Sequence, residues 1–197
     1  ENYEHPALPE GAEQGILKGL YLLKDSKVKS KSRVQMLGSG TILREVIAAA
    51  ELLEKDWDVA ADVWSATSFT ELRRDGLAVD RWNLLHPEEK AQLPYVTQCL
   101  EKRAGPVVAA SDYMKTFADQ IRPFMPKDRV YKVLGTDGFG RSDSRARLRH
   151  FFEVNRYFVV IAALKALAES GDGKAKTVAE AIRKYGIDPE KPDPTTV

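Results

Sequence analysis

The chain has 197 residues, of which 43% are hydrophobic and 30% charged, and its formal net charge is +1. This composition is typical of a folded globular protein and excludes a disordered or fibrous chain. The near-zero charge argues against a nucleic-acid partner, and the longest apolar run, YFVVIAALKALA, is too short to span a bilayer, so we expect neither nucleic acid nor membrane as a partner.

The single cysteine, Cys99, cannot form an internal disulfide and therefore indicates a reducing compartment, which we expect to be the cytoplasm. We interpret its thiol as a buried structural group, because no histidine lies near it in the sequence.

Residues 1–32 are predicted to be a linker with one short strand around Leu20–Leu23, and the first residue, a glutamate, indicates a piece of a longer protein. A basic loop follows this strand, and its cations could contact phosphates of a nucleic acid. The net charge favours a plain surface loop instead. The cations are Lys24, Lys27, Lys29, Lys31 and Arg33.

Residues 33–197 are predicted to form one α/β domain. RVQML, DVAADVWSAT, GPVVAAS and RVYKVLG have the apolar character of strands, and helical patterns separate them. This alternation predicts a three-layer α/β/α fold with a mostly parallel, mixed sheet of about five strands. From residue 187 the proline-rich tail is expected to be disordered and to form no helix.

Three helical segments carry specific expectations. The helix in TILREVIAAAELLEKD should bury one face, which carries Ile42, Val46, Ala49, Ala50 and Leu53. Ser68 and Glu71 have capping-box spacing, so a helix should begin near Phe69 and weaken or end at Gly76. The segment RWNLLHP groups an aromatic ring, an amide and an imidazole, which we expect to pack on the sheet or, as the alternative, to line a pocket.

The turn LGSGTIL places Gly38 and Gly40 between a strand and a helix, where a dinucleotide site would hold its pyrophosphate. Leu43 replaces the third glycine of that motif. We therefore predict a tight turn capped by Thr41 or Ser39 rather than a nucleotide site.

A second glycine loop, LGTDGFGRSDSR, has no Lys-Ser/Thr pair and is no Walker A loop. Ser142 or Asp143, with Asp143 preferred, is predicted to cap the following helix. The loop could bind an anion through its amides and arginines, or Arg145 and Arg149 could pair with carboxylates across an interface. The candidate interface or anion-contact residues are Gly138, Phe139, Gly140, Arg141, Ser142, Arg145 and Arg149.

The remaining sequence offers no complete active site. His5, His86 and His150 lack metal-ligand spacing, and a Gly-x-Ser-x-Gly elbow is missing. We therefore predict no catalytic, cofactor-binding or metal-binding residues on this chain.

Several long segments in order resemble one family. ENYEHPALPEGAEQGILKG, LGSGTILREVIAAAELL, DVWSATSFTELRRDG, PVVAASDYMKTFADQIRPF and VLGTDGFGRSDSRARLRHFFEV are similar to the C-terminal domain of the homodimeric, bacterial type of pyruvate dehydrogenase E1 component. That family belongs to the transketolase-like thiamine diphosphate enzymes. The resemblance covers residues 1 to about 186, and it implies that residues 1–32 lead from a middle domain that precedes this one.

The resemblance also implies a function. Full-length E1 oxidatively decarboxylates pyruvate and passes the acetyl group to lipoyl-E2, with thiamine diphosphate and Mg²⁺ held by its other domains. This domain would be a structural and dimer-interface part, inactive alone, with the other E1 domains, a second E1 subunit and E2 dihydrolipoyl acetyltransferase as partners. The alternative is a stand-alone regulatory module that binds a small anion or nucleotide.

Overall fold

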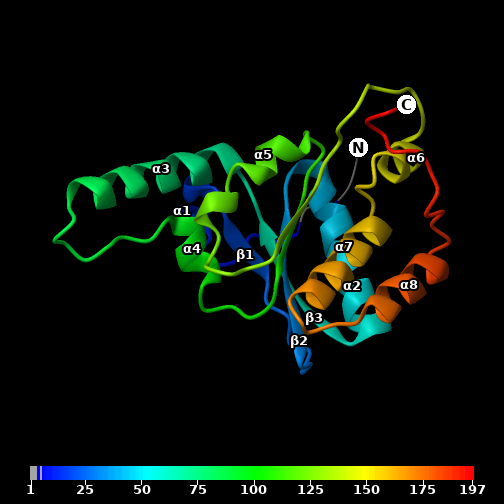
Figure 1. Ribbon diagram of the computed structural model, residues 1–197, viewed down its shortest axis with the longest axis horizontal. Helices are drawn as coiled ribbons and strands as arrows, with labels where there is room; N and C mark the ends of the chain where they lie inside the picture. Colours follow the sequence, from blue (N-terminus) through cyan, green and yellow to red (C-terminus); the bar gives the residue numbers. More distant parts are fainter. Residues whose placement is uncertain (1–3, 5) are drawn as a thin grey trace.

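The computed structural model describes residue 4 and residues 6–197. A five-stranded sheet forms the middle of three layers, with helices on both of its faces (Figure 1). The strands are β1 (Tyr21–Lys24), β2 (Ser32–Gly38), β3 (Val59–Ser65), β4 (Val107–Ala110) and β5 (Tyr131–Leu134). Their order is β1-β3-β2-β4-β5, with β1 antiparallel to β3 and the others parallel. The predicted α/β/α fold with a mixed sheet is confirmed.

The helices follow the strands in the predicted alternation. They are α1 (Glu13–Lys18), α2 (Leu43–Trp57), α3 (Phe69–Leu85), α4 (Tyr95–Leu100), α5 (Lys115–Asp119), α6 (Arg145–Phe151), α7 (Arg156–Glu169) and α8 (Ala175–Lys184), with short 3₁₀ turns η1 (Gly40–Ile42) and η2 (Arg122–Phe124). Every residue of β3 and β4 is buried, because helices cover both faces of a parallel sheet.

One face of the sheet is covered by α2 and α7, with α8 packed outside them (Figure 1). The predicted buried face of α2 is confirmed, because Ile42, Val46, Ala49, Ala50 and Leu53 are each no more than 1% exposed. They pack in the larger core with apolar side chains of α7. Full burial of one Leu or Val contributes about 1.5–3 kcal/mol to folding, so this layer is a main source of stability.

The opposite face carries a second core beneath α3, α4 and α5, and this core contains a buried polar network. The fully buried Asp62 carboxylate accepts hydrogen bonds from the Ser26 backbone N–H at 3.0 Å, from Gln35 Nε2 at 2.8 Å and from Arg33. Trp64 Nε1 donates to Gln35 Oε1 at 2.8 Å. Because its buried polar atoms are partnered, the network is tolerated inside an apolar layer.

The described part of the predicted linker contributes to the fold. The strand expected around Leu20–Leu23 is present as β1, but helix α1 before it was not predicted. In the basic loop, Lys24 pairs with Glu54 at 3.3 Å and Lys27 with Asp25 at 2.7 Å. These internal pairs support a surface loop rather than a phosphate-binding one.

Helix α3 departs from its prediction. Ser68 caps it as expected, since Ser68 Oγ accepts the Glu71 backbone N–H at 3.0 Å. The expected break at Gly76 is wrong, because the helix continues to Leu85. A Cβ at Gly76 would lie 2.5 Å from the Phe124 ring. The glycine is therefore needed for close packing, and it does not end the helix.

The second half of α3 and the loop after it form an arm, residues 77–94, that projects away from the sheet and the other helices (Figure 1). Trp82, Asn83 and His86 lie on this arm rather than against the sheet, so the expected packing is wrong. The Trp82 and His86 rings stack at 4.4 Å, and Asn83 bonds to the backbone of Gln92 instead.

The tail beyond residue 187 has no helix or strand, as predicted, but it is packed rather than loose. Ile187 and Pro194 are buried. Lys191 Nζ donates to the Phe151 carbonyl at 2.9 Å and pairs with Glu153 at 2.9 Å. Across residue 4 and residues 6–197, the helices are too short or too polar for any of them to cross a bilayer.

Candidate functional site

The carboxyl ends of β2, β4 and β5 lie at one edge of the sheet, and the loops after them enclose a crevice. The chain crosses from β2 to β3 on one side and then returns to β4 on the other, so the winding reverses between β2 and β4. Open α/β sheets bind ligands outside such a reversal. The Ser39 N–H donates to the Ala110 carbonyl, and the Ser111 N–H to the Leu134 carbonyl, each at 3.2 Å. These bonds hold the three loops together.

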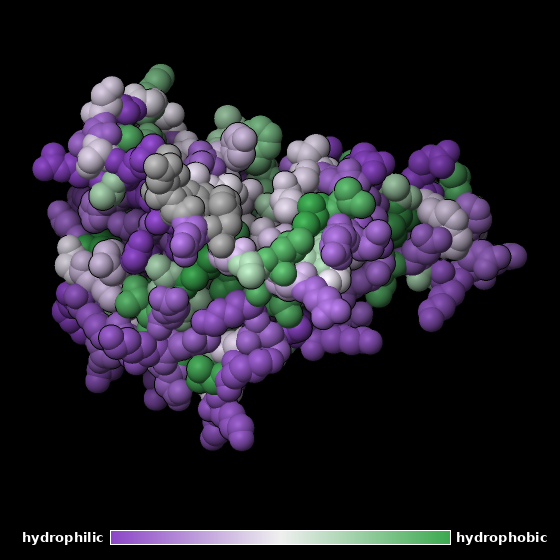
Figure 2. Space-filling model, turned by 180° about the vertical axis from the view of Figure 1, so that it is seen from behind, coloured by the Kyte–Doolittle hydropathy of each residue, from purple (hydrophilic) through white to green (hydrophobic). Residues whose placement is uncertain are grey.

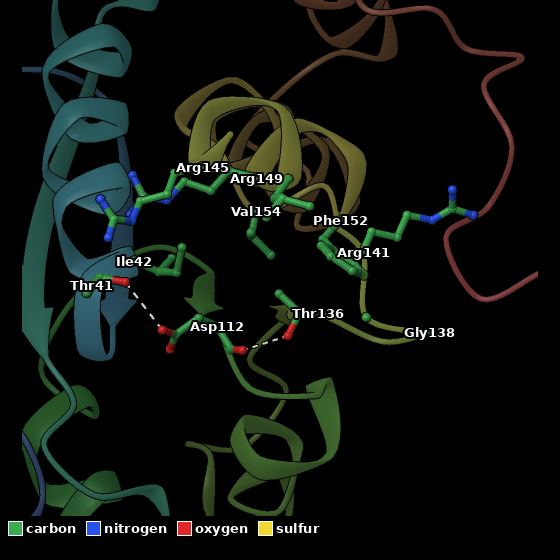
Figure 3. A pocket seen from close by; sticks show the side chains of 12 residues that line it. Thr41, Ile42, Asp112, Thr136, Gly138, Arg141, Arg145, Arg149, Phe152 and Val154 are labelled. Atoms are coloured by element: carbon green, nitrogen blue, oxygen red, sulfur yellow. Dashed lines mark hydrogen bonds between the residues drawn. The ribbon is translucent and has the colours of Figure 1, made fainter. Parts of the chain in front are cut away.

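The crevice has a volume of about 430 Å³ and an apolar floor, with hydroxyl and carboxylate groups on one wall and arginines on another (Figure 3). Its lining consists of Thr41, Ile42, Asp112, Thr136, Gly138, Gly140, Arg141, Arg145, Leu148, Arg149, Phe152 and Val154. Five of the seven candidate residues are therefore brought together here, while Phe139 and Ser142 are not part of the lining.

Asp112 places a carboxylate on the wall nearest the first glycine turn. Thr41 Oγ1 donates to Asp112 Oδ2 at 3.3 Å, and Thr136 Oγ1 donates to the Asp112 carbonyl at 2.6 Å. Gly40 has a φ of +56°, and a Cβ there would lie 3.1 Å from Asp112 Oδ1. A phosphate at this turn would meet a carboxylate, so the geometry favours the predicted tight turn. Of the two predicted caps, Ser39 occupies the N-cap position of η1, but its side chain makes no capping hydrogen bond.

The glycines of the second loop serve close packing. A Cβ at Gly135 would lie 2.6 Å from the Tyr113 carbonyl. Gly138 has a φ of +108°, and its Cβ would lie 2.3 Å from the Pro194 carbonyl of the tail. At Gly140, in contrast, a Cβ would meet no atom within 4 Å. The loop is therefore shaped by its contacts with the chain after β4 and with the tail.

The two side chains that follow Gly138 and Gly140 contribute little to the crevice, because Phe139 is not part of its lining and the guanidinium of Arg141 points away from it. Phe139 is 78% exposed. The Arg141 guanidinium lies 4.4 Å from the centre of the Phe151 ring, and in Figure 3 it points toward the tail, away from Arg145 and Arg149. Such a cation–π contact fixes the arginine without a carboxylate.

The predicted cap of α6 is corrected by the structure. Ser144, not Ser142 or Asp143, occupies the N-cap position, and its Oγ lies 3.5 Å from the Arg147 backbone N–H. Asp143 Oδ1 instead accepts the Ser144 N–H at 2.7 Å and lies 3.8 Å from Arg147. The helix therefore begins at Arg145, and Arg145 and Arg149 extend from it toward α2 (Figure 3).

Glu45 on α2 is the central charged residue of this region, and it was not predicted. Its side chain is 6% exposed. Arg149 NH1 donates to Glu45 Oε1 at 3.3 Å, while Arg156 donates through Nε at 3.0 Å, NH2 at 3.1 Å and its backbone N–H at 2.9 Å. Burial opposes ionisation of Glu45, but the hydrogen bonds from Arg156 and the charge of Arg149 outweigh it, so its pKa lies below the usual value. Arg149 thus pairs within the chain, and Glu45 links α2, α6 and α7.

Exposed aromatic and sulfur-containing side chains stand at the same edge of the sheet. Tyr113 is 60% exposed, Met114 51% and Phe117 44%, and the Tyr113 and Phe117 rings lie 5.3 Å apart. Phe139, 78% exposed, adds a further large apolar side chain at this edge. Protein interfaces are enriched in these residue types and in arginine.

Other reactive groups are not assembled into a site. Burial raises the pKa of the half-buried Cys99 thiol, which makes it a poor nucleophile. His86 lies on the arm and His150 beside the Phe158 ring, while His5 lies outside the described residues. Within residue 4 and residues 6–197, no three His, Cys, Asp or Glu side chains come close enough to hold a metal ion.

Comparison with known proteins shows what the chain is similar to. Residues 19–155 match the family described as the transketolase-like TK C-terminal domain. The chain is 63% identical to a pyruvate dehydrogenase E1 component of Pseudomonas aeruginosa over 194 residues, which is 98% of this chain and 22% of that protein. It is 56% identical to the Escherichia coli K12 protein of the same name over 194 residues, 98% of this chain and 21% of that protein.

Among solved structures, a transketolase from Leishmania mexicana aligns with a TM-score of 0.54 at 18% identity, over 85% of this chain and 21% of that one. This likeness shows the fold alone. The chain spans about a fifth of the length of the curated relatives that it matches. The match over residues 19–155 and the near-complete coverage by E1 components place the chain in the transketolase-like C-terminal domain family.

Proposed function

We propose that this chain is the C-terminal domain of an E1 component in a bacterial, cytoplasmic pyruvate dehydrogenase complex. The parent enzyme would oxidatively decarboxylate pyruvate and transfer the acetyl group to a lipoyl group on E2. The observation that carries this proposal is the 63% identity over 98% of the chain to a protein of that name.

Within such an enzyme, we assign the cofactor to other domains. Bound thiamine diphosphate would supply the carbanion chemistry of the decarboxylation, and Mg²⁺ would hold its diphosphate. The residues present here do not fit that group. The first glycine turn faces the Asp112 carboxylate, and the described residues hold no cluster of metal-ligating side chains. No chemical step is therefore assigned to this chain.

The role that fits the geometry is structural. We assign the carboxyl edge of the sheet, with Tyr113, Phe117, Phe139 and Arg145, to contacts with the other E1 domains or with the second E1 subunit. Large apolar side chains next to arginines are the residues that contribute most to binding at protein interfaces. E2 would be a partner of the assembled enzyme.

A second candidate function is binding of a small anion in the crevice. The arginines on its wall favour this function, but Asp112 stands on another wall and Glu45 already pairs with Arg149. These carboxylates offset the positive charge, so we rank the anion site below the interface. Calorimetric titration with inorganic phosphate tests it, and binding that Arg145→Ala abolishes would establish it.

The experiment for the main proposal exchanges the matched segment of the Pseudomonas aeruginosa E1 component for this chain. We expect the exchanged enzyme to decarboxylate pyruvate within a few-fold of the parent rate. The isolated chain should neither turn over pyruvate nor bind thiamine diphosphate at micromolar concentration in calorimetry. Turnover by the isolated chain, or complete loss of activity in a folded exchanged enzyme, would refute the proposal.

A further inference from the structure

The arm, residues 77–94, exposes a stripe of three leucines, with Arg81 among them, on one side of α3. Leu77 is 46% exposed, Leu84 77% and Leu85 54%. Helical geometry places these three leucines and Arg81 within about 100° of the helix circumference. Single exposed leucines need no explanation, but a contiguous stripe marks an interaction surface. In Figure 2 the arm extends to the right, and hydrophobic side chains are visible along it among hydrophilic ones.

Packing within the described residues does not account for the length of α3. No residue from Leu77 to Leu85 is buried, whereas Phe69, Leu72 and Gly76 are. Helices in proteins are stabilised mainly by packing of an apolar face, but the leucine stripe on the outer half of α3 stays 46–77% exposed within the described part of the chain.

The arm is nevertheless held in one shape. Asn83 Nδ2 donates to the Gln92 carbonyl at 3.0 Å, and the Gln92 N–H donates back to Asn83 Oδ1 at 2.8 Å. At its base, the Tyr95 N–H donates to Asp75 Oδ2 at 2.6 Å. A surface fixed before binding loses less conformational entropy when a partner docks on it.

Arg81 decides which kind of partner fits. It lies midway between Leu77 and Leu85, and its side chain makes no hydrogen bond or ion pair within the described residues. Two copies of the stripe packed antiparallel about a two-fold axis would bring the two Arg81 guanidinium groups together. Like charges opposed in an apolar contact are strongly unfavourable, so a second copy of the arm is a poor partner.

We propose that the arm docks on a segment of the E1 polypeptide outside this chain, one that presents apolar side chains around a carboxylate facing Arg81. This inference rests on the proposed function. About four-fifths of the length of the E1 relatives lies outside the matched segment, so the enzyme has ample surface to cover the stripe.

The test uses the full-length enzyme in which this chain replaces the matched segment of the Pseudomonas aeruginosa E1 component. The photoreactive residue p-benzoylphenylalanine replaces Leu84, and the crosslinked peptides are identified by mass spectrometry. The matched control carries it at Leu17, which is 71% exposed on α1. We expect Leu84 to crosslink to E1 peptides outside the chain. Crosslinks to residues 1–197 of a second copy, to added E2, or to nothing would overturn the inference.

A charge reversal gives a second readout. Arg81→Glu should lower the crosslinking yield at position 84 about tenfold or more, because the facing carboxylate would then be repelled. Arg183→Glu, an exposed arginine on α8, should leave the yield unchanged. Equal effects of the two reversals would contradict the role of Arg81.

Crosslinking can be measured whether or not the exchanged enzyme turns over pyruvate. An inactive enzyme that crosslinks at Leu84 refutes the proposed function and keeps the arm contact. An active enzyme without the crosslink supports the proposed function and refutes the arm contact.

Discussion

The crevice at the carboxyl edge and the arm both carry arginines beside apolar surface, but they differ in how the charges are balanced. In the crevice, Arg149 is 15% exposed and pairs with the buried Glu45. On the arm, Arg81 is exposed and has no partner within the described residues. A charge that is paired inside the chain helps to hold its helices together, whereas an unpaired charge on an apolar stripe points to a partner. Changes in the two regions should therefore act on different properties.

The largest expected effect is that of Glu45→Ala. It would leave the largely buried Arg149 without its carboxylate, and breaking a buried pair by removing one partner costs about 3–5 kcal/mol of the free energy of unfolding. Arg156, whose side chain is 44% exposed, would be solvated and should add little to this loss. Urea denaturation followed by circular dichroism measures this loss. Glu180→Ala, which removes an exposed pair with Lys176, is the control and should barely move the midpoint. Equal urea midpoints for Glu45→Ala and the control would contradict the stabilising role assigned to Glu45.

The next effect is that of Gly138→Ala, expected at about 1–3 kcal/mol, because an L side chain is strained at a φ of +108° and would collide with the Pro194 carbonyl. The variant should also speed hydrogen exchange in residues 187–197, as the tail is displaced. Gly140→Ala is the matched control in the same loop and should stay within about 0.5 kcal/mol, since a Cβ there meets nothing. Unchanged exchange in the Gly138 variant would argue against the tail contact.

Acid should weaken the crevice region through Glu45. The pKa of Glu45 is lowered in the folded state, so its stabilisation is present above the ordinary carboxyl pKa of about 4.3 and is lost as the pH falls through the lower folded value. The free energy of unfolding of Glu45→Gln should therefore depend less steeply on pH below about pH 4. Hydrogen bonds from Lys27 and Arg103 lower the pKa of Asp25 to about 2, so part of the acid dependence should remain. Identical slopes for the variant and the unaltered chain would exclude Glu45 as a contributor.

The smallest effect on stability is expected on the arm. Leu84→Asp replaces a side chain that is 77% exposed, so the free energy of unfolding of the isolated chain should change by no more than about 0.5 kcal/mol. Leu72→Ala on the buried part of the same helix should cost about 2–5 kcal/mol. A large loss from Leu84→Asp in the same urea titration would show that the arm packs against the body.

The fold could largely be predicted because its signals are local. Apolar runs such as RVQML and DVAADVWSAT alternate with helical periodicity, and the buried face of α2 follows directly from the spacing of Ile42, Val46 and Leu53. Gly76 shows the limit of such rules. A glycine usually weakens a helix, but here the Phe124 ring, far along the chain, requires one.

The candidate site was harder to predict for the same reason. The partners of Glu45 lie 104 and 111 residues away, so the pattern of α2 gives no sign that this carboxylate is buried. Ser142, Asp143 and Ser144 all suit a helix cap, and only the structure selects Ser144. The sequence was enough to single out the arginines of the second loop as candidates. It could not predict in which directions their side chains point.

The pair between Glu45 and Arg156 also bears on where this domain can be divided. The family match stops at residue 155, one position before the arginine that binds Glu45. Beyond it, α7 contributes Val159, Val160 and Leu164 to the larger core. A polypeptide trimmed to residues 19–155 would keep α2 but lose α7, so the apolar part of the sheet face over β4 and β5 would be exposed to solvent and prone to aggregation. The packed domain therefore continues past the end of the family match at residue 155.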